Sequence, residues 1–249
     1  MMVHCRDLPG IDVPMAFRNH QSGRCLTIGH RGAAGLAAEN TLPGFELATR
    51  LGVDAVELDI HWAHGALWVI HDATLERTTD GTGALEDSDF DTLRRLDAGA
   101  GALIPLLEEV LAVIPASIGI NIELKGKGCA APAAAMLATH LERDLLVSSF
   151  DYGELQRFHR LRPEIPVAPL FSRWRPDAWR RAAQVEAWSI NLAARIATDA
   201  RINDAHERGF KVLVYTVNEP ADAARLTRSG VDGLFTDFPD KIEVASATS

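Results

Sequence analysis

Three kinds of feature are scarce in this 249-residue chain, and each scarcity excludes a class of protein. The three cysteines are odd in number, lie far apart and have no Cys-x-x-Cys spacing, so they indicate reduced thiols rather than a disulfide framework or a zinc site. No apolar run approaches the roughly 20 residues that span a bilayer, and the first two dozen residues lack the apolar segment of a signal peptide. We therefore expect a cytoplasmic protein without stable membrane insertion.

Positive charge is also scarce. The chain has 25 Lys and Arg residues against 34 Asp and Glu residues, a formal net charge of -9. Such a chain has no global attraction to nucleic acid or to anionic membranes, and it contains no basic patch interleaved with aromatic residues. We expect no nucleic-acid partner, and an anionic small-molecule substrate would have to be captured by locally placed cations. Composition leaves the oligomeric state open.

From Cys25 onward, short apolar runs alternate with amphipathic segments, whereas residues 1–24 show no periodicity and are expected to form a partly ordered N-terminal tail. Regular strand–helix alternation predicts parallel strands with helical crossovers. We therefore expect residues 25–249 to form one α/β domain, a (β/α)8 TIM barrel, with an open doubly wound sheet as the alternative. An extended excursion over 66–71 and a polar, irregular stretch over about 73–104 predict a small insertion after the second strand. The eight expected strands cover residues 25–30, 53–60, 117–124, 145–148, 165–170, 185–191, 211–217 and 231–236, and the helix expected before the fourth of them covers residues 131–143.

Three carboxylates fall on two of these strands. Glu57 and Asp59 are two residues apart, so their side chains leave the same face of a strand, and Glu123 ends a later strand. Neighbouring carboxylates repel each other unless a proton or a cation resolves the conflict. Three carboxylates without a nearby cysteine favour a hard divalent ion such as Mg²⁺ or Ca²⁺. The alternative is that the pair only forms ion pairs with basic residues at the barrel rim.

Two histidines, His30 and His71, end expected extended segments next to the carboxylates. Imidazole is the usual side chain for proton transfer near neutral pH, so both are candidate acid/base groups. Each alone could equally be a histidine satisfied by an ordinary hydrogen bond. His61 shares the face of the acidic pair, and His64 lies close in sequence, but neither has a clear chemical role.

Two cations, Arg31 and Lys125, lie at the same expected rim, where they suit the oxygens of a phosphate or balance the carboxylates. Asn40 could hydrogen-bond a substrate or tie down its own loop. A hard cation, two acid/base histidines and two phosphate-binding cations together favour phosphodiester cleavage.

These motifs resemble those of the glycerophosphodiester phosphodiesterases, over about residues 27–242. The likeness rests on motifs that occur in the family's order: His30–Gly32, Glu39–Thr41, Val56–Asp59, His71–Asp72, Leu75–Gly83, Leu107–Leu111, Glu123–Lys125, Ser148–Phe150, Tyr215–Asn218 and Gly230–Pro239.

The resemblance implies a barrel with an insertion after the second strand, a divalent ion held by the three carboxylates, and the two histidines as general acid and base. It also implies phosphate contacts from Arg31 and Lys125. A glycerol hydroxyl would attack phosphorus to give a cyclic phosphate, which water opens to glycerol 3-phosphate and an alcohol. Two departures concern the substrate pocket: the turn 61–65 differs from the family's usual turn, and Tyr215 stands where the family usually has Trp.

Three hypotheses follow. The first is a metal-dependent phosphodiesterase acting on glycerophosphodiesters such as glycerophosphocholine or glycerophosphoethanolamine. The second keeps the chemistry but takes lysophospholipids, as a lysophospholipase D-type hydrolase. The third is a catalytically silent barrel that binds a phosphorylated ligand.

Overall fold

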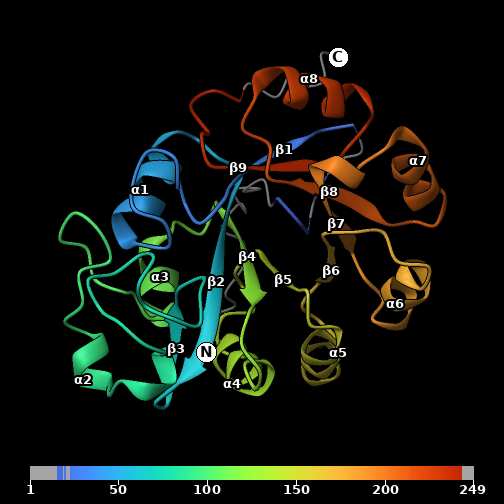
Figure 1. Ribbon diagram of the computed structural model, residues 1–249. Coiled ribbons are helices and arrows are strands. Elements are labelled where there is room, and N and C mark those ends of the chain that lie inside the picture. The colour runs from blue at the N-terminus through green and yellow to red at the C-terminus, as the bar shows by residue number, and fades with distance from the viewer. Residues whose placement is uncertain (1–15, 19, 21–22, 243–249) are drawn as a thin grey trace, which may run out of the picture.

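Parallel strands form a closed barrel at the centre of the fold, which Figure 1 shows nearly along the barrel axis. The computed structural model describes residues 16–18, 20 and 23–242. The parallel strands follow one another in chain order around the sheet, and β1 pairs with both β9 and β2, which closes the ring. The predicted (β/α)8 barrel is therefore confirmed, and the open sheet is wrong. Its strands are β1 (Leu26–Gly29), β2 (Ala55–Ala63), β4 (Gly119–Leu124), β5 (Leu145–Ser149), β6 (Val167–Phe171), β7 (Ser189–Ala193), β8 (Lys211–Tyr215) and β9 (Gly233–Thr236).

Helices surround the barrel and bury their apolar faces against the strands. The first begins where the side chain of Thr41 accepts a hydrogen bond from the backbone N–H of Gly44, with proline in its first turn. Helix α4 (Ala130–Leu137) ends before residue 143, where the sequence predicts its end, because Thr139 and His140 bond the carbonyl of Met136 and turn the chain. The helices between the strands are α1 (Leu42–Arg50), α3 (Leu107–Val113), α4 (Ala130–Leu137), α5 (Tyr152–Leu161), α6 (Ala178–Gln184), α7 (Asp199–Glu207) and α8 (Pro220–Arg228).

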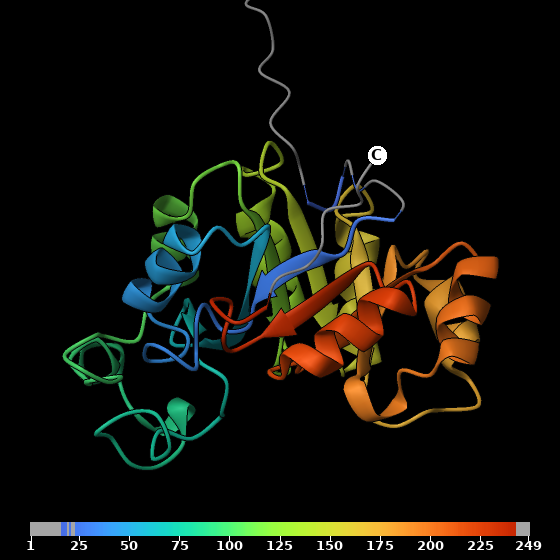
Figure 2. The same ribbon diagram turned by 90° about the horizontal axis from the view of Figure 1, so that it is seen from above.

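The expected insertion leaves the barrel after β2. Strand β3 (Ala66–Val69) turns back antiparallel to β2, and an irregular stretch follows with a 3-10 turn (Leu85–Asp87) and the short helix α2 (Phe90–Leu93). Seen from above, this stretch stands off one side of the barrel (Figure 2). It has its own small apolar cluster around Trp68, Leu75 and Leu93. The insertion is therefore an ordered addition beside the barrel mouth.

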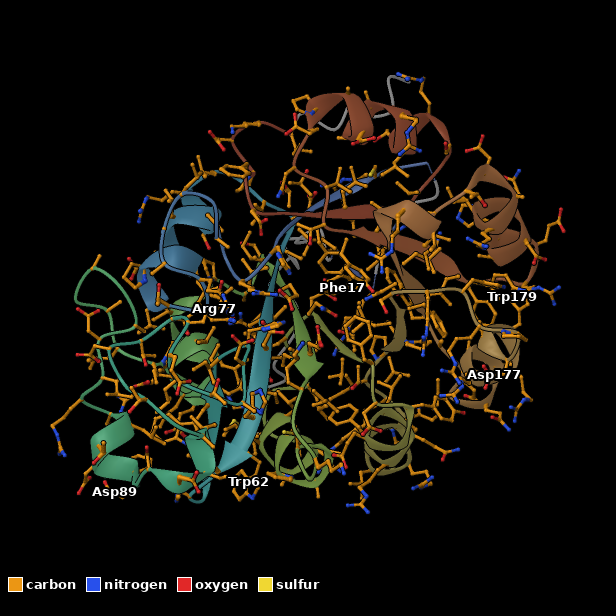
Figure 3. The ribbon with its side chains drawn as sticks, in the orientation of Figure 1. Phe17, Trp62, Arg77, Asp89, Asp177 and Trp179 are labelled. Atoms are coloured by element: carbon orange, nitrogen blue, oxygen red, sulfur yellow. The ribbon has the colours of Figure 1, made fainter. Side chains whose placement is uncertain are left out.

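The lumen of the barrel is filled by apolar side chains at the N-terminal ends of the strands. Phe17, which precedes the first strand, is 1% exposed and lies in this cluster with Leu26, Ala55 and Leu146. Its backbone N–H donates to Asp144, and the ring lies near the middle of the barrel in Figure 3. Most of the tail predicted over 1–24 lies outside the described residues. Within the described part of the chain, no helix combines the length and apolar character that a membrane span requires.

Candidate active site

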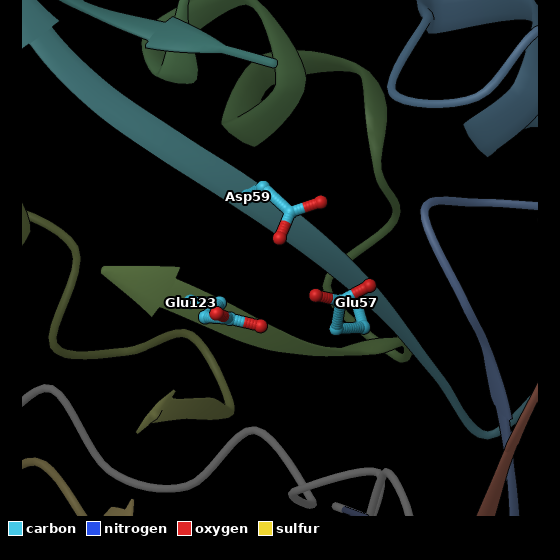
Figure 4. Close-up of side chains that lie close together, drawn as sticks. All are labelled: Glu57, Asp59 and Glu123. Carbon is cyan, nitrogen blue, oxygen red and sulfur yellow. The ribbon is translucent and has the colours of Figure 1, made fainter. Parts of the chain in front are cut away.

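The three predicted carboxylates meet on two neighbouring strands, toward the C-terminal face of the barrel. Glu57 and Asp59 lie on β2, and Glu123 lies on β4 directly beside Asp59 in the strand register. One oxygen atom from each carboxylate lies within 4.8 Å of the others, and all three side chains are buried (Figure 4). This is the face of a barrel where the connecting loops form a site.

Burial and mutual repulsion make this cluster unfavourable without positive charge. Burial, followed by the charges of Asp59 and Glu123, raises the pKa of Glu57 well above its usual value, and burial with the charge of Asp59 raises the pKa of Glu123 to about 7. Among the described residues, Oδ1 of Asp59 has no hydrogen-bond partner although it is buried. An oxygen-only ligand set with an unsatisfied carboxylate suits a hard divalent ion, so the three carboxylates can hold one.

The alternative expectation, ion pairing with basic residues, is met at the same time. Lys125 Nζ lies 3.0 Å from Glu123 Oε1 and 3.8 Å from an oxygen of Asp59. Arg31 Nε lies 3.3 Å from the other oxygen of Asp59. Two cations therefore already face the three carboxylates, and both are placed to contact an anion bound beside them.

His30 follows β1 and is fixed by a partner from the far end of the chain. Its Nδ1 lies 2.6 Å from Oδ1 of Asp237, and Asn218 donates to the other oxygen of Asp237 at 2.7 Å. The opposite ring nitrogen, Nε2, lies 4.0 Å from an oxygen of Glu57. Burial works against ionisation of Asp237, but the hydrogen bond and charge of His30 lower the pKa of this carboxyl. His30 thus has one nitrogen anchored and the other facing the carboxylate cluster.

His71 follows β3 and has the same arrangement. Its Nδ1 lies 2.5 Å from Oδ1 of Asp72, and its Nε2 lies 3.0 Å from Lys125 Nζ. Burial lowers the pKa of His71, which favours the neutral ring. A hydrogen bond from Arg77 is the main cause that lowers the pKa of Asp72 to about 2. Because an ammonium group only donates, Nε2 of His71 accepts here and carries no proton.

The turn after β1 brings a backbone amide to the site as well as a side chain. Arg31 has the left-handed backbone conformation, with φ of 51°, and Gly32 follows with φ of 85°. This sharp turn lets the backbone N–H of Arg31 donate to Glu57 at 2.9 Å. Glycine is required at the second position because an added Cβ would lie 2.7 Å from the backbone of Gly44.

Asn40 lies beside the carboxylates, whereas Tyr215 lies at the cavity. Asn40 is buried, donates to Asp59 Oδ2 at 2.9 Å and accepts from the backbone N–H of Asp59 at 3.3 Å. It orients one of the three carboxylates, and its predicted contact with substrate stays a prediction. Tyr215 lines the cavity described next; burial raises the pKa of its phenol, and its hydroxyl has no partner among the described residues.

A cavity of about 230 Å³ joins these groups. One side is polar and carries both histidines, both cations and two of the three carboxylates. The other side is apolar and comes from the ends of other strands. That apolar side consists of Phe150, Leu170, Tyr215 and Phe235.

Comparison with known proteins decides the family. The profile of the glycerophosphoryl diester phosphodiesterase family matches residues 30–241. The chain belongs to this family. It is 36% identical over 230 residues to a glycerophosphodiester phosphodiesterase of Bacillus altitudinis, a match that covers 85% of this chain and 94% of the relative. It is 31% identical over 234 residues to that of Caldanaerobacter subterraneus subsp. tengcongensis, covering 88% and 96%.

Among solved structures, a phosphodiesterase of Oleispira antarctica in complex with the product sn-glycerol-3-phosphate aligns with a TM-score of 0.82 and 32% identity. The alignment covers 89% of this chain and 98% of that one. The glycerophosphodiester phosphodiesterase of Agrobacterium tumefaciens aligns with a TM-score of 0.75 and 30% identity, covering 87% and 98%. As a member of this family, the chain is an enzyme that hydrolyses phosphoric diesters.

In this phosphodiesterase the groups that hold the histidines are the ones that sequence reasoning did not assign. Asp237 and Asn218 fall within motifs quoted for the family, and Asp72 follows His71 directly, yet no local pattern gives them a role. His61 Nε2 lies 3.1 Å from the carbonyl of His71, and His64 Nε2 lies 3.3 Å from the carbonyl of Leu85. These two histidines hold backbone groups and do not line the cavity.

Proposed function

We propose that this enzyme hydrolyses glycerophosphodiesters such as glycerophosphocholine or glycerophosphoethanolamine to glycerol 3-phosphate and an alcohol. The observation that carries the proposal is the shared cavity. Two histidines, each anchored through Nδ1 to a carboxylate, line the same space as the oxygen-rich cluster and two cations. The Oleispira antarctica structure, with sn-glycerol-3-phosphate as its product, gives independent support for this product.

The phosphate would lie between Arg31, Lys125 and the three carboxylates. The carboxylates would hold Mg²⁺ or Ca²⁺, which when bound supplies positive charge that polarises the phosphate oxygens. The guanidinium and the ammonium would add charge-assisted hydrogen bonds to the same oxygens. Lys125 contacts Nε2 of His71, so a bound phosphate that attracts Lys125 would free this nitrogen for proton transfer.

In the first step His71 would accept the proton of a glycerol hydroxyl, whose oxygen attacks phosphorus to form a cyclic phosphate. His30 would protonate the oxygen of the departing alcohol. In the second step the roles reverse. His30 would accept a proton from a water molecule that attacks phosphorus, and His71 would protonate the glycerol oxygen whose bond to phosphorus breaks, so that glycerol 3-phosphate forms. This assignment is supported by the unprotonated Nε2 of His71 and by the carboxylate oxygens near both ring nitrogens of His30.

The test is release of glycerol 3-phosphate from glycerophosphocholine and glycerophosphoethanolamine, with EDTA, and then with Mg²⁺ or Ca²⁺ restored. Turnover that EDTA abolishes and one ion restores is the expected result. No release with either ion would reject these substrates. Lysophosphatidylcholine is then the next substrate, because Phe150, 46% exposed, offers an apolar surface at the cavity. Failure there as well would favour the silent, phosphate-binding barrel.

The histidine roles have a sharper test. His30→Ala and His71→Ala are each expected to lower kcat by about 10²–10⁴. A diester with a good leaving group, such as p-nitrophenol, needs no proton on departure. Release of the first equivalent of p-nitrophenol is therefore expected to be restored in His30→Ala but not in His71→Ala, whereas later hydrolysis of the cyclic phosphate should stay slow in His30→Ala. The reverse pattern would exchange the two roles. His64→Ala, which removes an exposed histidine outside the cavity, is the matched control.

The cytoplasmic location is part of the proposal. It is supported by Cys25 and Cys129, which are both free and buried. Labelling of the thiols in unfolded protein taken directly from cells tests the reduced state that this location requires.

A further inference from the structure

One arginine of the insertion reaches across to the loop that follows β1. Arg77 donates from Nη1 and Nη2 to the two oxygens of Glu39, each at 2.8 Å. Its Nε donates to Oδ2 of Asp72. Figure 3 places Arg77 beside α1, where the insertion meets the barrel. A single guanidinium therefore bridges two carboxylates from different segments of the chain.

Each of these carboxylates holds a group that faces the cavity. The other oxygen of Asp72 lies 2.5 Å from Nδ1 of His71. Glu39 also accepts from Nη1 of Arg31 at 2.9 Å. Hydrogen bonds thus connect His71 with Arg31 through Asp72, Arg77 and Glu39. The two ends of this chain are the histidine and the cation that line one side of the cavity.

The geometry of the bridge suits positioning better than stabilisation. The side chain of Arg77 is 46% exposed, and exposed ion pairs contribute little to folding. A planar guanidinium with five donors, by contrast, fixes the direction of every carboxylate that it binds in paired fashion. Lysine, a point charge on a flexible stem, cannot bind Glu39 through two parallel hydrogen bonds and reach Asp72 as well.

We propose that Arg77 is a positioning residue that sets the orientation of His71 and Arg31 together, so that the insertion forms part of the active site. This inference rests on the proposed function. Arg77 does not line the cavity and touches no reacting atom; it acts through Asp72 and Glu39.

Arg77→Ala is expected to lower kcat/KM for glycerophosphodiesters by about 10- to 100-fold, as loss of an outer partner does at other sites. Both constants should change: kcat falls because His71 loses its orientation, and KM rises because Arg31 loses Glu39 as a fixed partner. Arg77→Lys should resemble Arg77→Ala. Thermal unfolding of both variants should stay close to wild type. Arg95→Ala is the matched control, since Arg95 is an exposed arginine of the same insertion.

Two further readouts separate positioning from a general structural defect. Guanidinium ion added at millimolar concentration should restore part of the activity of Arg77→Ala and none of that of His71→Ala. In a double-mutant cycle, Arg77→Ala should raise KM much less on a Glu39→Gln background, because both changes break the connection to Arg31, whereas the loss in kcat through Asp72 should persist. Additive losses without guanidinium rescue, or wild-type kcat and KM in Arg77→Ala, would overturn the proposal.

Calorimetry can measure the affinity of wild type and of Arg77→Ala for sn-glycerol 3-phosphate. This measurement tests the role of Arg77 separately from the proposed function. If wild type binds the phosphate but turns over no glycerophosphodiester, weaker binding by Arg77→Ala still supports positioning of Arg31, and equal binding refutes it. If wild type neither binds nor turns over, both proposals fall. If wild type is active and Arg77→Ala matches it, only the role of Arg77 falls.

Discussion

Asp237 Oδ1 lies 2.6 Å from Nδ1 of His30, and these two residues are 207 positions apart in the chain. The bond joins the loops after the first and the last strand of the barrel, which are neighbours only because the barrel closes. It fixes the tautomer and the direction of the imidazole, so that Nε2 faces the cavity. Barrel closure is therefore itself a requirement for the placement of this candidate acid.

Replacing this carboxylate tests the arrangement. Asp237→Asn keeps the shape of the side chain but removes its charge, so His30 loses the charged partner that fixes the direction of its ring. We expect kcat to fall about 10- to 100-fold with a smaller change in KM. Steady-state kinetics with glycerophosphocholine measure both. Asp240→Asn, an exposed aspartate nearby, should behave as wild type, and an equal loss in both variants would contradict a specific role for Asp237.

The carboxylate cluster predicts a stability that depends on pH and metal. Folding raises the pKa of Glu123 from 4.5 to about 7, so its contribution to stability is fully present below 4.5 and is lost as the pH rises through about 7. Metal-free protein should therefore have a lower Tm at about pH 8 than at about pH 5.5, apart from other titrations. The increase in Tm on adding Mg²⁺ or Ca²⁺ should grow over the same interval. Calorimetry with EDTA and with each ion measures this.

Glu123→Gln separates repulsion from metal binding. The variant removes one buried charge from the cluster, and we expect metal-free stability near pH 8 to increase by on the order of 1–3 kcal/mol. The increase in Tm with metal should at the same time nearly disappear. A variant that keeps the full response to metal would show that Glu123 is not a ligand.

Tyr215→Phe removes one oxygen atom, the hydroxyl of the side chain. This hydroxyl is buried without a partner among the described residues, and leaving it unsatisfied is costly unless substrate or water fills the need. Tyr215→Phe should therefore keep or raise the free energy of unfolding, by up to about 1 kcal/mol. If the hydroxyl binds substrate, KM should rise while kcat changes less. Steady-state kinetics with glycerophosphocholine and glycerophosphoethanolamine measure KM and kcat, and urea unfolding measures the free energy of unfolding. A higher KM indicates a contact with substrate, and an unchanged KM indicates a hydroxyl that bonds only water.

Phe17 provides a prediction about the fold alone. Because this ring is fully buried at the N-terminal end of the barrel, Phe17→Ala should destabilise the protein by about 3–5 kcal/mol. The chemistry at the opposite end should be retained at temperatures where the variant is folded. Leu161→Ala, at an exposed leucine, should change stability by less than about 0.5 kcal/mol. A stable Phe17→Ala variant would mean that the barrel closes without this side chain.

The sequence predicted the strands, and with them the groups that strands deliver, because parallel strands in a barrel all end at the same face. That rule brings Glu57, Asp59 and Glu123 together without any further information. It cannot find Asp237 or Arg77, whose roles depend on loops that meet only in the closed barrel. The early end of α4 was missed for a similar reason: it depends on side-chain bonds to one carbonyl, which leave the apolar pattern unchanged.

The two sides of the cavity have a consequence for how this enzyme can change. The groups that we propose to bind phosphate and to move protons lie on or directly after β1, β2 and β4 and in the segment after β3, whereas Phe150 follows β5 and Leu170 and Tyr215 lie on β6 and β8. Mutational variation in the second half of the barrel can therefore select among leaving alcohols while the reaction chemistry stays intact. Variants that change only the loops that follow β5, β6 and β8 could accept new diesters while they keep the groups proposed for the reaction. Divergence between natural relatives can follow the same route, one half of the barrel at a time.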